Sequence, residues 1–259
     1  MSIQFLSRLP IKRFNLKKTP DFASTAYAFP LAGIIIALPM GLIIVLATQT
    51  TMPDMVIAFL AVITMTVTTG ALHEDGLADM VDGFWGSNER EKKLLIMRES
   101  TVGTYGVLVL VITSGLRIVL ITTLLQKLSC SIAILLMIAV ASLSRAAILI
   151  PWILLPPARA PMKEKNQLCK NQFSLSIIFG KPNSSAYLPT TLCSFPAIFI
   201  LFTASGFLPG LCALLTAILM TQYIVSLSRR HISGCTGDIL GATQQISELG
   251  LLLGFISVL

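Results

Sequence analysis

The sequence predicts an all-α fold: a polytopic integral membrane bundle of about six transmembrane helices with polar cytoplasmic loops. Charged residues make up only 12% of the chain, whereas about a quarter of a typical soluble chain is charged. Hydrophobic residues make up 54%, and the mean hydropathy is +0.83. Several apolar runs reach the ~20 residues that a membrane-spanning helix needs. We expect a single membrane-embedded domain over residues 1–259.

Six apolar runs are long enough to cross a bilayer as helices. They are Tyr27–Ala47, Met55–Leu72, Tyr105–Leu125, Ile132–Leu155, Leu188–Ser205 and Phe207–Leu227. A further apolar segment, Leu249–Leu259, is too short to cross by itself. We expect this segment to lie at the interface, to dock against the bundle or to extend a helix that begins upstream.

Lysine and arginine residues are concentrated in every second segment that connects these runs. Five precede the first run, four separate the second from the third, five separate the fourth from the fifth and two follow the sixth. The opposite loops contain only Lys127. The positive-inside rule therefore predicts six spans with both ends in the cytoplasm. This distribution also explains the net charge of +7, so we expect a lipid bilayer as a partner and no nucleic acid.

Four carboxylates follow the second run, in the stretch HEDGLADMVDG that begins at His73. On a helix, Asp75, Asp79 and Asp82 share one face, because positions i, i+4 and i+7 form a stripe, whereas Glu74 points elsewhere. Three carboxylates on one face repel each other unless a cation lies between them. Hard oxygen donors suit Mg²⁺ or Mn²⁺. The stretch predicts a site for Mg²⁺ or Mn²⁺, and a solvated acidic helix end is the alternative.

A second polar cluster follows the sixth run. It begins with Arg229 and Arg230, which together can hold phosphate in forked geometry. Thr236 and Gly237 lie in a glycine-containing turn whose backbone amides can bind an anion at the start of a helix. Asp238 either adds a metal ligand on the same membrane face or simply caps that helix.

Two further arginines are candidate phosphate ligands. Arg98 lies in the basic segment after the acidic stretch, which indicates either a phosphate-facing wall beside the metal or an ordinary interfacial helix. Arg145 lies within the fourth run, where a charge is costly and usually faces the bundle interior. It either pairs with an acid or reaches a substrate phosphate. Arg117 lies close enough to a span end for snorkelling, and we assign it no role.

Four motifs and one arginine occur in order over nearly the whole chain. The motifs are FLSRLPI (Phe5–Ile11), HEDGLADMVDGFWG (His73–Gly86), IMRESTVGTYG (Ile96–Gly106) and TGDILGATQQISE (Thr236–Glu248), and the arginine is Arg145 in SRAA. Their combination resembles the cobalamin synthase family, adenosylcobinamide-GDP ribazoletransferase. Three positions depart from the family pattern, which has Asp, a basic residue and Glu there: Glu99, Thr101 and Gln245. The departures affect the polar network around the site and leave the three aspartates intact.

The resemblance implies an integral enzyme of the bacterial cytoplasmic (inner) membrane that acts late in coenzyme B12 assembly. It would join adenosylcobinamide-GDP to α-ribazole or its 5′-phosphate, giving adenosylcobalamin or its 5′-phosphate and releasing GMP. The family uses Mg²⁺, and Asp75, Asp79 and Asp82 would be the metal-binding acids. A homo-oligomer is compatible with these features.

This reaction needs charge neutralisation and in-line positioning of the reacting groups. A ribose hydroxyl of the ribazole attacks the phosphorus attached to cobinamide, and GMP leaves. We expect Arg98, Arg229 or Arg230 to contact the phosphates. Glu74 and Asp82 are the candidates for the carboxylate that helps to deprotonate the hydroxyl.

Three other functions fit parts of the pattern. A CDP-alcohol phosphotransferase needs an Ala-Arg pair and later acids, which the run DMVDGFWGS from Asp79 lacks. A membrane prenyltransferase needs a second aspartate-rich helix, where this chain has only Asp238 and Glu248. A cation transporter places its acids near the bilayer midplane, whereas these acids are predicted at the membrane boundary.

Overall fold

The computed structural model describes residues 2–10, 25–159, 182 and 184–259. Every regular element in these residues is a helix and none is a strand, which confirms the predicted all-α class. The α-helices are α1 (Ser2–Leu6), α3 (Phe29–Ala47), α4 (Asp54–Thr69), α5 (Leu72–Gly86), α6 (Arg90–Ile96), α7 (Thr104–Lys127), α8 (Cys130–Ala147), α9 (Leu149–Leu154), α11 (Tyr187–Ser205), α12 (Phe207–Ile232) and α13 (Gly237–Ile256). Short 3₁₀ helices, Ala26–Ala28 and Ser184–Ala186, precede α3 and α11.

Within the described residues, six helical segments are long and apolar enough to cross a membrane. They are Ala26–Ala47, Thr104–Lys127, Cys130–Leu154, Tyr187–Ala204, Phe207–Ile232 and Gly237–Ile256. The first five confirm five of the predicted spans. Large apolar side chains on their outer faces are exposed, as lipid-facing side chains are, including Leu42, Ile112, Leu192 and Leu219. The chain is a multi-pass membrane protein.

The second predicted span is broken. α4 ends at Thr69, and α5 leaves it at an angle of 88°. Gly70 (φ +66°) and Ala71 (φ +57°) both adopt the left-handed conformation, so they turn the chain where we predicted one continuous helix. The N-terminal segment covers this break, because the amide of Arg8 donates a hydrogen bond to the carbonyl oxygen of Thr68 at 2.8 Å. α4 and α5 together can make one bent crossing.

The apolar C-terminal segment is the second half of the 20-residue helix α13. Of the three placements that we considered, the extension of an upstream helix is confirmed. α13 packs against α12, α5, α8 and α7, which explains why it is among the most buried helices of the bundle. The described residues contain six candidate spans, or up to seven if the bent pair is one crossing, which agrees with the predicted count of about six, although α13 was not among the six predicted runs.

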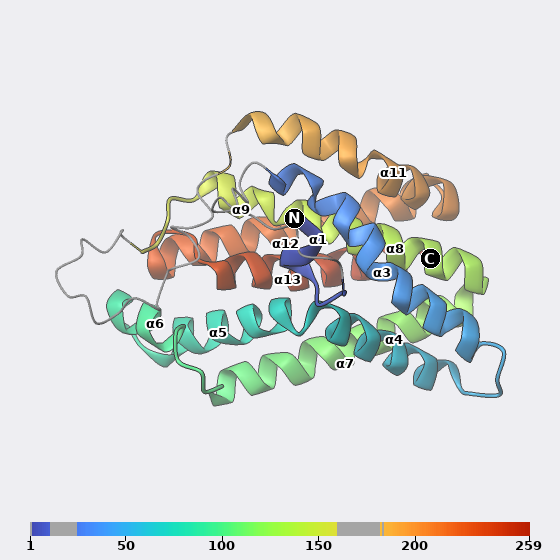
Figure 1. Ribbon diagram of the computed structural model, residues 1–259, viewed down its shortest axis with the longest axis horizontal. Helices are drawn as coiled ribbons and strands as arrows, with labels where there is room; N and C mark the ends of the chain where they lie inside the picture. Colours follow the sequence, from blue (N-terminus) through green and yellow to red (C-terminus); the bar gives the residue numbers. More distant parts are fainter. Residues whose placement is uncertain (1, 11–24, 160–181, 183) are drawn as a thin grey trace.

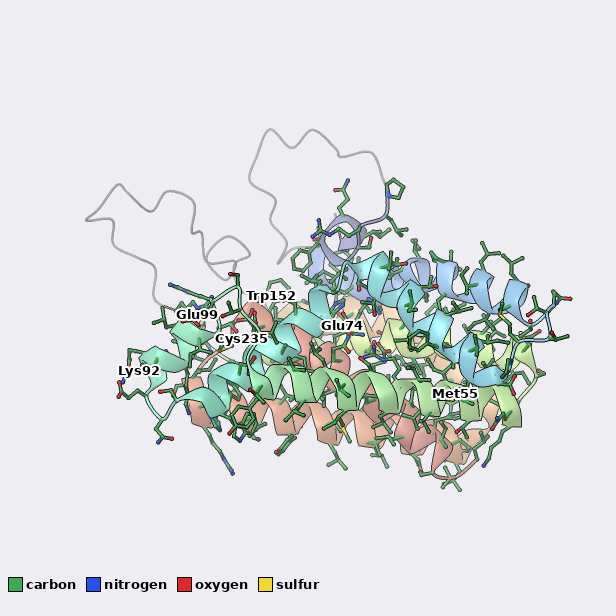
Figure 2. All side chains as sticks on the ribbon, turned by 90° about the horizontal axis from the view of Figure 1, so that it is seen from below. Met55, Glu74, Lys92, Glu99, Trp152 and Cys235 are labelled. Carbon is green, nitrogen blue, oxygen red and sulfur yellow. The ribbon has the colours of Figure 1, made fainter. Side chains whose placement is uncertain are left out.

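The polar segments gather at one end of the bundle. In Figure 1, α6 and the turn between α12 and α13 lie at the left, whereas the α3–α4 and α7–α8 turns lie at the right. Figure 2 shows Lys92 and Glu99 at one end, Met55 at the other and Glu74 between them. We call the first of these the polar end, formed by α6 and residues 97–103, 156–159 and 229–238. The basic residues within 11–24 and 160–181, which the topology prediction counted, lie outside the described residues.

Candidate active site

A close crossing of α5 and α13 builds the site. A Cβ atom added to Gly76 on α5 would lie 2.9 Å from the carbonyl oxygen of Asp238 and 3.3 Å from Cα of Gly241. A Cβ atom added to Gly241 would lie 3.2 Å from the carbonyl oxygen of His73. Small residues allow membrane helices to approach each other this closely. The crossing therefore brings the first turn of α13 against the acidic stretch.

Three carboxylates gather at this crossing: those of Asp75, Asp79 and Asp238, which we call the acidic cluster. Asp79 is half-buried, and the negative charges of Asp238, Asp75 and Asp82 act on it, in that order, with Arg159 opposing them. Thr236 holds Asp238 in place, because its hydroxyl donates to Oδ2 at 3.0 Å. Two of the predicted metal ligands on α5 and the one predicted on α13 thus share one neighbourhood.

Asp82, the third predicted ligand on α5, has a different environment. Its side chain is buried, and its two oxygens accept hydrogen bonds from the backbone amides of Gly103 (2.7 Å) and Gly106 (2.8 Å) at the start of α7. Both positions require glycine, because a Cβ atom on either would collide with this carboxylate. A carboxylate at a helix N-terminus satisfies free amides and interacts favourably with the helix dipole. Asp82 thus fixes the start of α7 beside α5.

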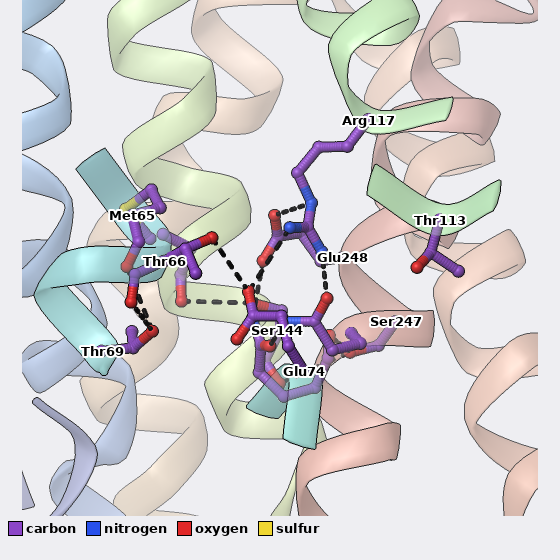
Figure 3. A network of polar contacts seen from close by, with 12 residues as sticks. Met65, Thr66, Thr69, Glu74, Thr113, Arg117, Ser144, Ser247 and Glu248 are labelled. Carbon is purple, nitrogen blue, oxygen red and sulfur yellow. Dashed lines mark hydrogen bonds and ion pairs between the residues drawn. The ribbon is translucent and has the colours of Figure 1, made fainter. Parts of the chain in front are cut away.

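Glu74 lies in a buried ion network halfway along the bundle (Figure 3). Arg117 on α7 is placed between two carboxylates: Nη1 lies 3.6 Å from Oε1 of Glu74, and Nε lies 3.0 Å from Oε1 of Glu248 on α13. Arg117 also donates to Gln245, and Thr66 donates to Glu74 at 3.5 Å. Charges inside a membrane bundle are costly unless they are paired. Arg117 is therefore a buried counter-ion, and it does not snorkel.

Amide side chains extend this ion network to α8. Gln244 donates to Oε2 of Glu248 at 2.6 Å and to Oγ of Ser144 at 3.1 Å. Gln245 accepts from Arg117 and donates to Oε1 of Gln244 at 2.9 Å. A carboxylate at position 245 could accept from Arg117 but could not donate to Gln244. This explains how the network accommodates Gln245, one of the three departures from the family pattern.

Arg145 is completely buried, which agrees with its predicted orientation toward the bundle interior. Its Nη1 donates to the carbonyl oxygen of Ala141 at 2.8 Å, and the charges acting on it are those of Glu248, Glu74 and Arg117. Arg145 thus lies beside the ion network, where two arginines balance two glutamates.

The remaining predicted phosphate ligands lie at the polar end. Arg98 is exposed and interacts with the charges of Asp238 and Arg159. Arg229 and Arg230 are exposed on the last turn of α12. Within the described residues, no ion pair joins either of these two arginines to the acidic cluster. Among the described residues Arg98 forms no ion pair with the cluster either, but its positive charge acts on Asp238.

The predicted helix start after the second polar cluster is confirmed. α13 begins at Gly237, and Thr236 is its N-cap, with Oγ1 accepting from the amide of Ile239 at 3.5 Å. Asp238 lies in the first turn and does not supply the cap. Its side chain is therefore available to join the acidic cluster.

Arg159 joins the site although the sequence analysis gave it no role. Its Nη2 lies 3.9 Å from Oδ2 of Asp238. Burial lowers the pKa of the Arg159 guanidinium, and the nearby carboxylates of Asp238 and Asp79 act in the opposite direction. The sequence signal was weak: Arg159 follows Pro156 and Pro157 at the end of an apolar run, and we counted its charge toward topology alone.

The acidic cluster offers oxygen donors of the kind that Mg²⁺ takes, but it is not a complete metal site by itself. Within the described residues, no three His, Cys, Asp or Glu side chains form a ready-made metal-binding group. Mg²⁺ commonly takes only one or two protein carboxylates and fills its other positions with water and substrate phosphates. Asp75, Asp79 and Asp238 offer hard oxygen donors of this kind, and Arg98 and Arg159 lie beside them.

Comparison with known proteins identifies the family of the chain. The family model of cobalamin-5-phosphate synthase matches residues 1–256. The adenosylcobinamide-GDP ribazoletransferase of Azorhizobium caulinodans is 38% identical over 259 residues, covering 98% of this chain and 93% of the relative. The protein of the same name from Brucella canis is 36% identical over 265 residues, covering 100% of this chain and 95% of the relative. No solved structure is significantly similar to the chain.

These matches extend over the whole described bundle, including the acidic cluster, the ion network and the polar end. The chain therefore belongs to the cobalamin-5-phosphate synthase family, and it is a membrane transferase of cobalamin synthesis.

Proposed function

We propose that the polar end transfers the adenosylcobinamide phosphate moiety of adenosylcobinamide-GDP to α-ribazole or its 5′-phosphate, with release of GMP. The observation that carries this proposal is the grouping of Asp75, Asp79 and Asp238 beside Arg159, whose Nη2 lies 3.9 Å from Oδ2 of Asp238, with the charge of Arg98 acting on the same aspartate. Carboxylates that hold a cation and arginines that bind phosphate are the recurring components of phosphoryl transfer sites. The printed name of both relatives, which contains adenosylcobinamide-GDP and ribazole, supports the same substrates.

The reaction exchanges one phosphorus–oxygen bond for another. A ribose hydroxyl oxygen of the ribazole forms a bond to the phosphorus attached to cobinamide. The bond from that phosphorus to the GMP oxygen breaks, and GMP leaves with the bonding electron pair. Arg98 and Arg159 would bind the phosphates and hold them in line with the attacking hydroxyl.

The hydroxyl proton passes to a carboxylate. Glu74 and Asp82 are the bases expected from the sequence, but each already has partners: Glu74 is paired with Arg117, and Asp82 accepts from two backbone amides. We therefore assign the proton to Asp75 or Asp79, whichever of the two keeps a carboxylate oxygen that is not bound to the cation. Glu74 and Asp82 then act by positioning α5 and α7.

Magnesium belongs to the proposal as well. Asp75, Asp79 and Asp238 would hold Mg²⁺, which when bound neutralises charge on the diphosphate and on the leaving GMP. The side chains themselves are kept together by the crossing at Gly76 and by the Thr236 hydroxyl. We also propose that the polar end faces the cytoplasm, because most of the lysines and arginines among the described residues lie at that end.

The proposal is tested by GMP release from adenosylcobinamide-GDP in proteoliposomes, with and without α-ribazole and Mg²⁺. Wild-type protein should release GMP only when all three components are present. Asp79→Asn should lower the rate roughly 100-fold, as expected for the loss of a charge that stabilises the transition state. Asp54→Asn is the matched control, since Asp54 lies at the start of α4 and outside the acidic cluster. Release without α-ribazole would indicate a hydrolase, and a fully active Asp79→Asn would overturn the assignment of the cluster.

A further inference from the structure

The segment that carries Arg159 is fixed to the turn before α13. The amide of Ala158 donates to the carbonyl oxygen of Cys235 at 2.9 Å, and the amide of Cys235 donates to the carbonyl oxygen of Pro156 at 2.7 Å. Pro157 and Cys235 consequently form an isolated parallel β-bridge. The backbone next to Arg159 is thus held directly against the residues that lead to Asp238.

Two further contacts hold this segment in place. A Cβ atom added to Gly234 would lie 2.6 Å from Cα of Ala158, so the two backbones touch at a position that only glycine allows. Arg90 on α6 connects the end of α12 to the Arg159 segment, because its Nε donates to the carbonyl oxygen of Ile232 at 2.9 Å and its Nη2 donates to that of Ala158. Three elements far apart in the sequence thus determine where the Arg159 side chain begins.

The Arg159 guanidinium has N–H donors that make no hydrogen bond to the described residues. Its side chain is only 15% exposed, and its Nη2 lies 3.9 Å from Asp238, which is at the limit of an ion pair. The same nitrogen donates to the carbonyl oxygen of Leu94 at 3.5 Å, and the buried Nε has no hydrogen-bond partner in the described part of the chain. A guanidinium offers five N–H donors in a fixed fork. Most of the donors of this one are therefore unused.

A cation that is held rigidly, mostly buried and incompletely hydrogen-bonded is suited to an incoming oxyanion. The neighbours of Arg159 indicate which oxyanion: Asp79 and Asp238 on one side would hold a cation, and Arg98 supplies a second positive charge. A diphosphate bound to such a cation presents its remaining oxygens to both arginines. Exposed Arg98 can follow the ligand, whereas Arg159 is fixed.

We propose that Arg159 is the fixed phosphate-binding residue of the site and recognises the diphosphate of the nucleotide-activated substrate. This inference rests on the proposed function. It also predicts that Arg159 affects the binding of the diphosphate substrate and not that of the ribazole, because Arg159 contacts only the diphosphate. Asp238 keeps the guanidinium oriented until the substrate arrives.

The test compares Arg159→Ala and Arg159→Lys with wild-type protein in proteoliposomes. Arg159→Ala should weaken equilibrium binding of adenosylcobinamide-GDP, measured without α-ribazole, by about 10- to 100-fold, the range expected for a lost hydrogen bond to a charged group. The KM for α-ribazole should stay within about twofold. Arg159→Lys should bind better than Arg159→Ala and worse than wild type, because lysine keeps the charge and loses the fork.

Lys92→Ala is the matched control. Lys92 is a cation at the same end of the bundle, but it is exposed and pairs only with Glu89 among the described residues. Its removal should leave the binding of adenosylcobinamide-GDP unchanged. Equal binding by wild type and Arg159→Ala, or equal losses for both substrates, would overturn the inference about Arg159. Absence of GMP release by wild-type protein would instead overturn the proposed function, so the two failures are distinguishable. Arg159→Lys keeps the test decisive if Arg159→Ala does not fold.

Discussion

Nε of Arg117 lies 3.0 Å from Oε1 of Glu248, although α7 and α13 are separated by three spans in the sequence. Both side chains are nearly inaccessible to solvent, and Glu74 supplies a second carboxylate to the same guanidinium. Arg117 on α7 therefore connects α5, through Glu74, to α13, through Glu248. A pair buried to this extent is weak evidence for added stability, but breaking it leaves uncompensated charge.

Arg117→Met should destabilise the protein strongly. It leaves Arg145 as the one arginine among the described residues that faces the two glutamates Glu74 and Glu248, and removing one partner of a buried pair costs about 3–5 kcal/mol. We expect a clear fall in the apparent unfolding temperature in lipid nanodiscs. Lys127→Met is the control, because Lys127 is an exposed cation in the last turn of the same helix. A stable Arg117→Met together with an equally stable control would show that the glutamates are not ionised in the folded protein.

Asp82→Asn should loosen the start of α7. Asparagine keeps one oxygen acceptor and turns an N–H group toward a backbone amide, so at least one of the hydrogen bonds to Gly103 and Gly106 is lost, at a cost of about 1–3 kcal/mol. Hydrogen exchange of these amides should accelerate, while Asp79→Asn should leave it unchanged.

The same variant separates the two roles of Asp82. If Asp82 only positions α7, the Mg²⁺ concentration needed for half-maximal activity should not change in Asp82→Asn. If Asp82 binds metal, as the sequence predicts, that concentration should rise. A raised Mg²⁺ requirement with normal amide exchange would count against the positioning role.

Gly76→Ala should separate the acidic cluster. The added Cβ atom would lie 2.9 Å from the carbonyl oxygen of Asp238, so α5 and α13 must move apart, and overpacking of this kind typically costs about 1–3 kcal/mol. We expect GMP release to fall at least tenfold, as roughly expected for misplaced reacting groups. Gly115→Ala is the control, because nothing lies within 4 Å of a Cβ atom there, and it should retain full activity. Unchanged activity of Gly76→Ala would mean that the closeness of the crossing is not needed.

Hydropathy and charge predicted most of the fold, because lipid imposes long apolar helices that a single chain displays directly. They did not predict the break after α4. Gly70 and Ala71 sit inside an apolar run, and glycine is common in membrane helices, so its left-handed conformation carries no hydropathy signal. α13 as a whole was also missed as a span, because the polar residues Gln244, Gln245 and Glu248 near its middle lower its mean hydropathy.

The helical spacing of Asp75, Asp79 and Asp82 predicted a shared face, yet it could not show which partners each side chain meets. Asp82 turns to the amides of α7, whereas Asp238 comes from a distant helix to join the other two. Arg159 could not be found from spacing at all, since its position depends on a bridge to Cys235. Contacts between distant segments are decided by packing, and no local pattern encodes them.

Gly70→Ala should test what holds the bend between α4 and α5. The left-handed conformation at φ +66° costs an alanine roughly 1–2 kcal/mol, and the new Cβ atom would also lie 2.6 Å from Cγ of Arg8. The neighbouring Ala71 already tolerates a left-handed conformation, so the backbone term alone does not prevent folding. We therefore expect a cost in the unfolding free energy that depends on Arg8. In an Arg8→Ala background, Gly70→Ala should be less damaging by at least about 0.5 kcal/mol, as expected for residues in contact. Additive effects in this double-mutant cycle would show that the N-terminal segment does not press on the bend.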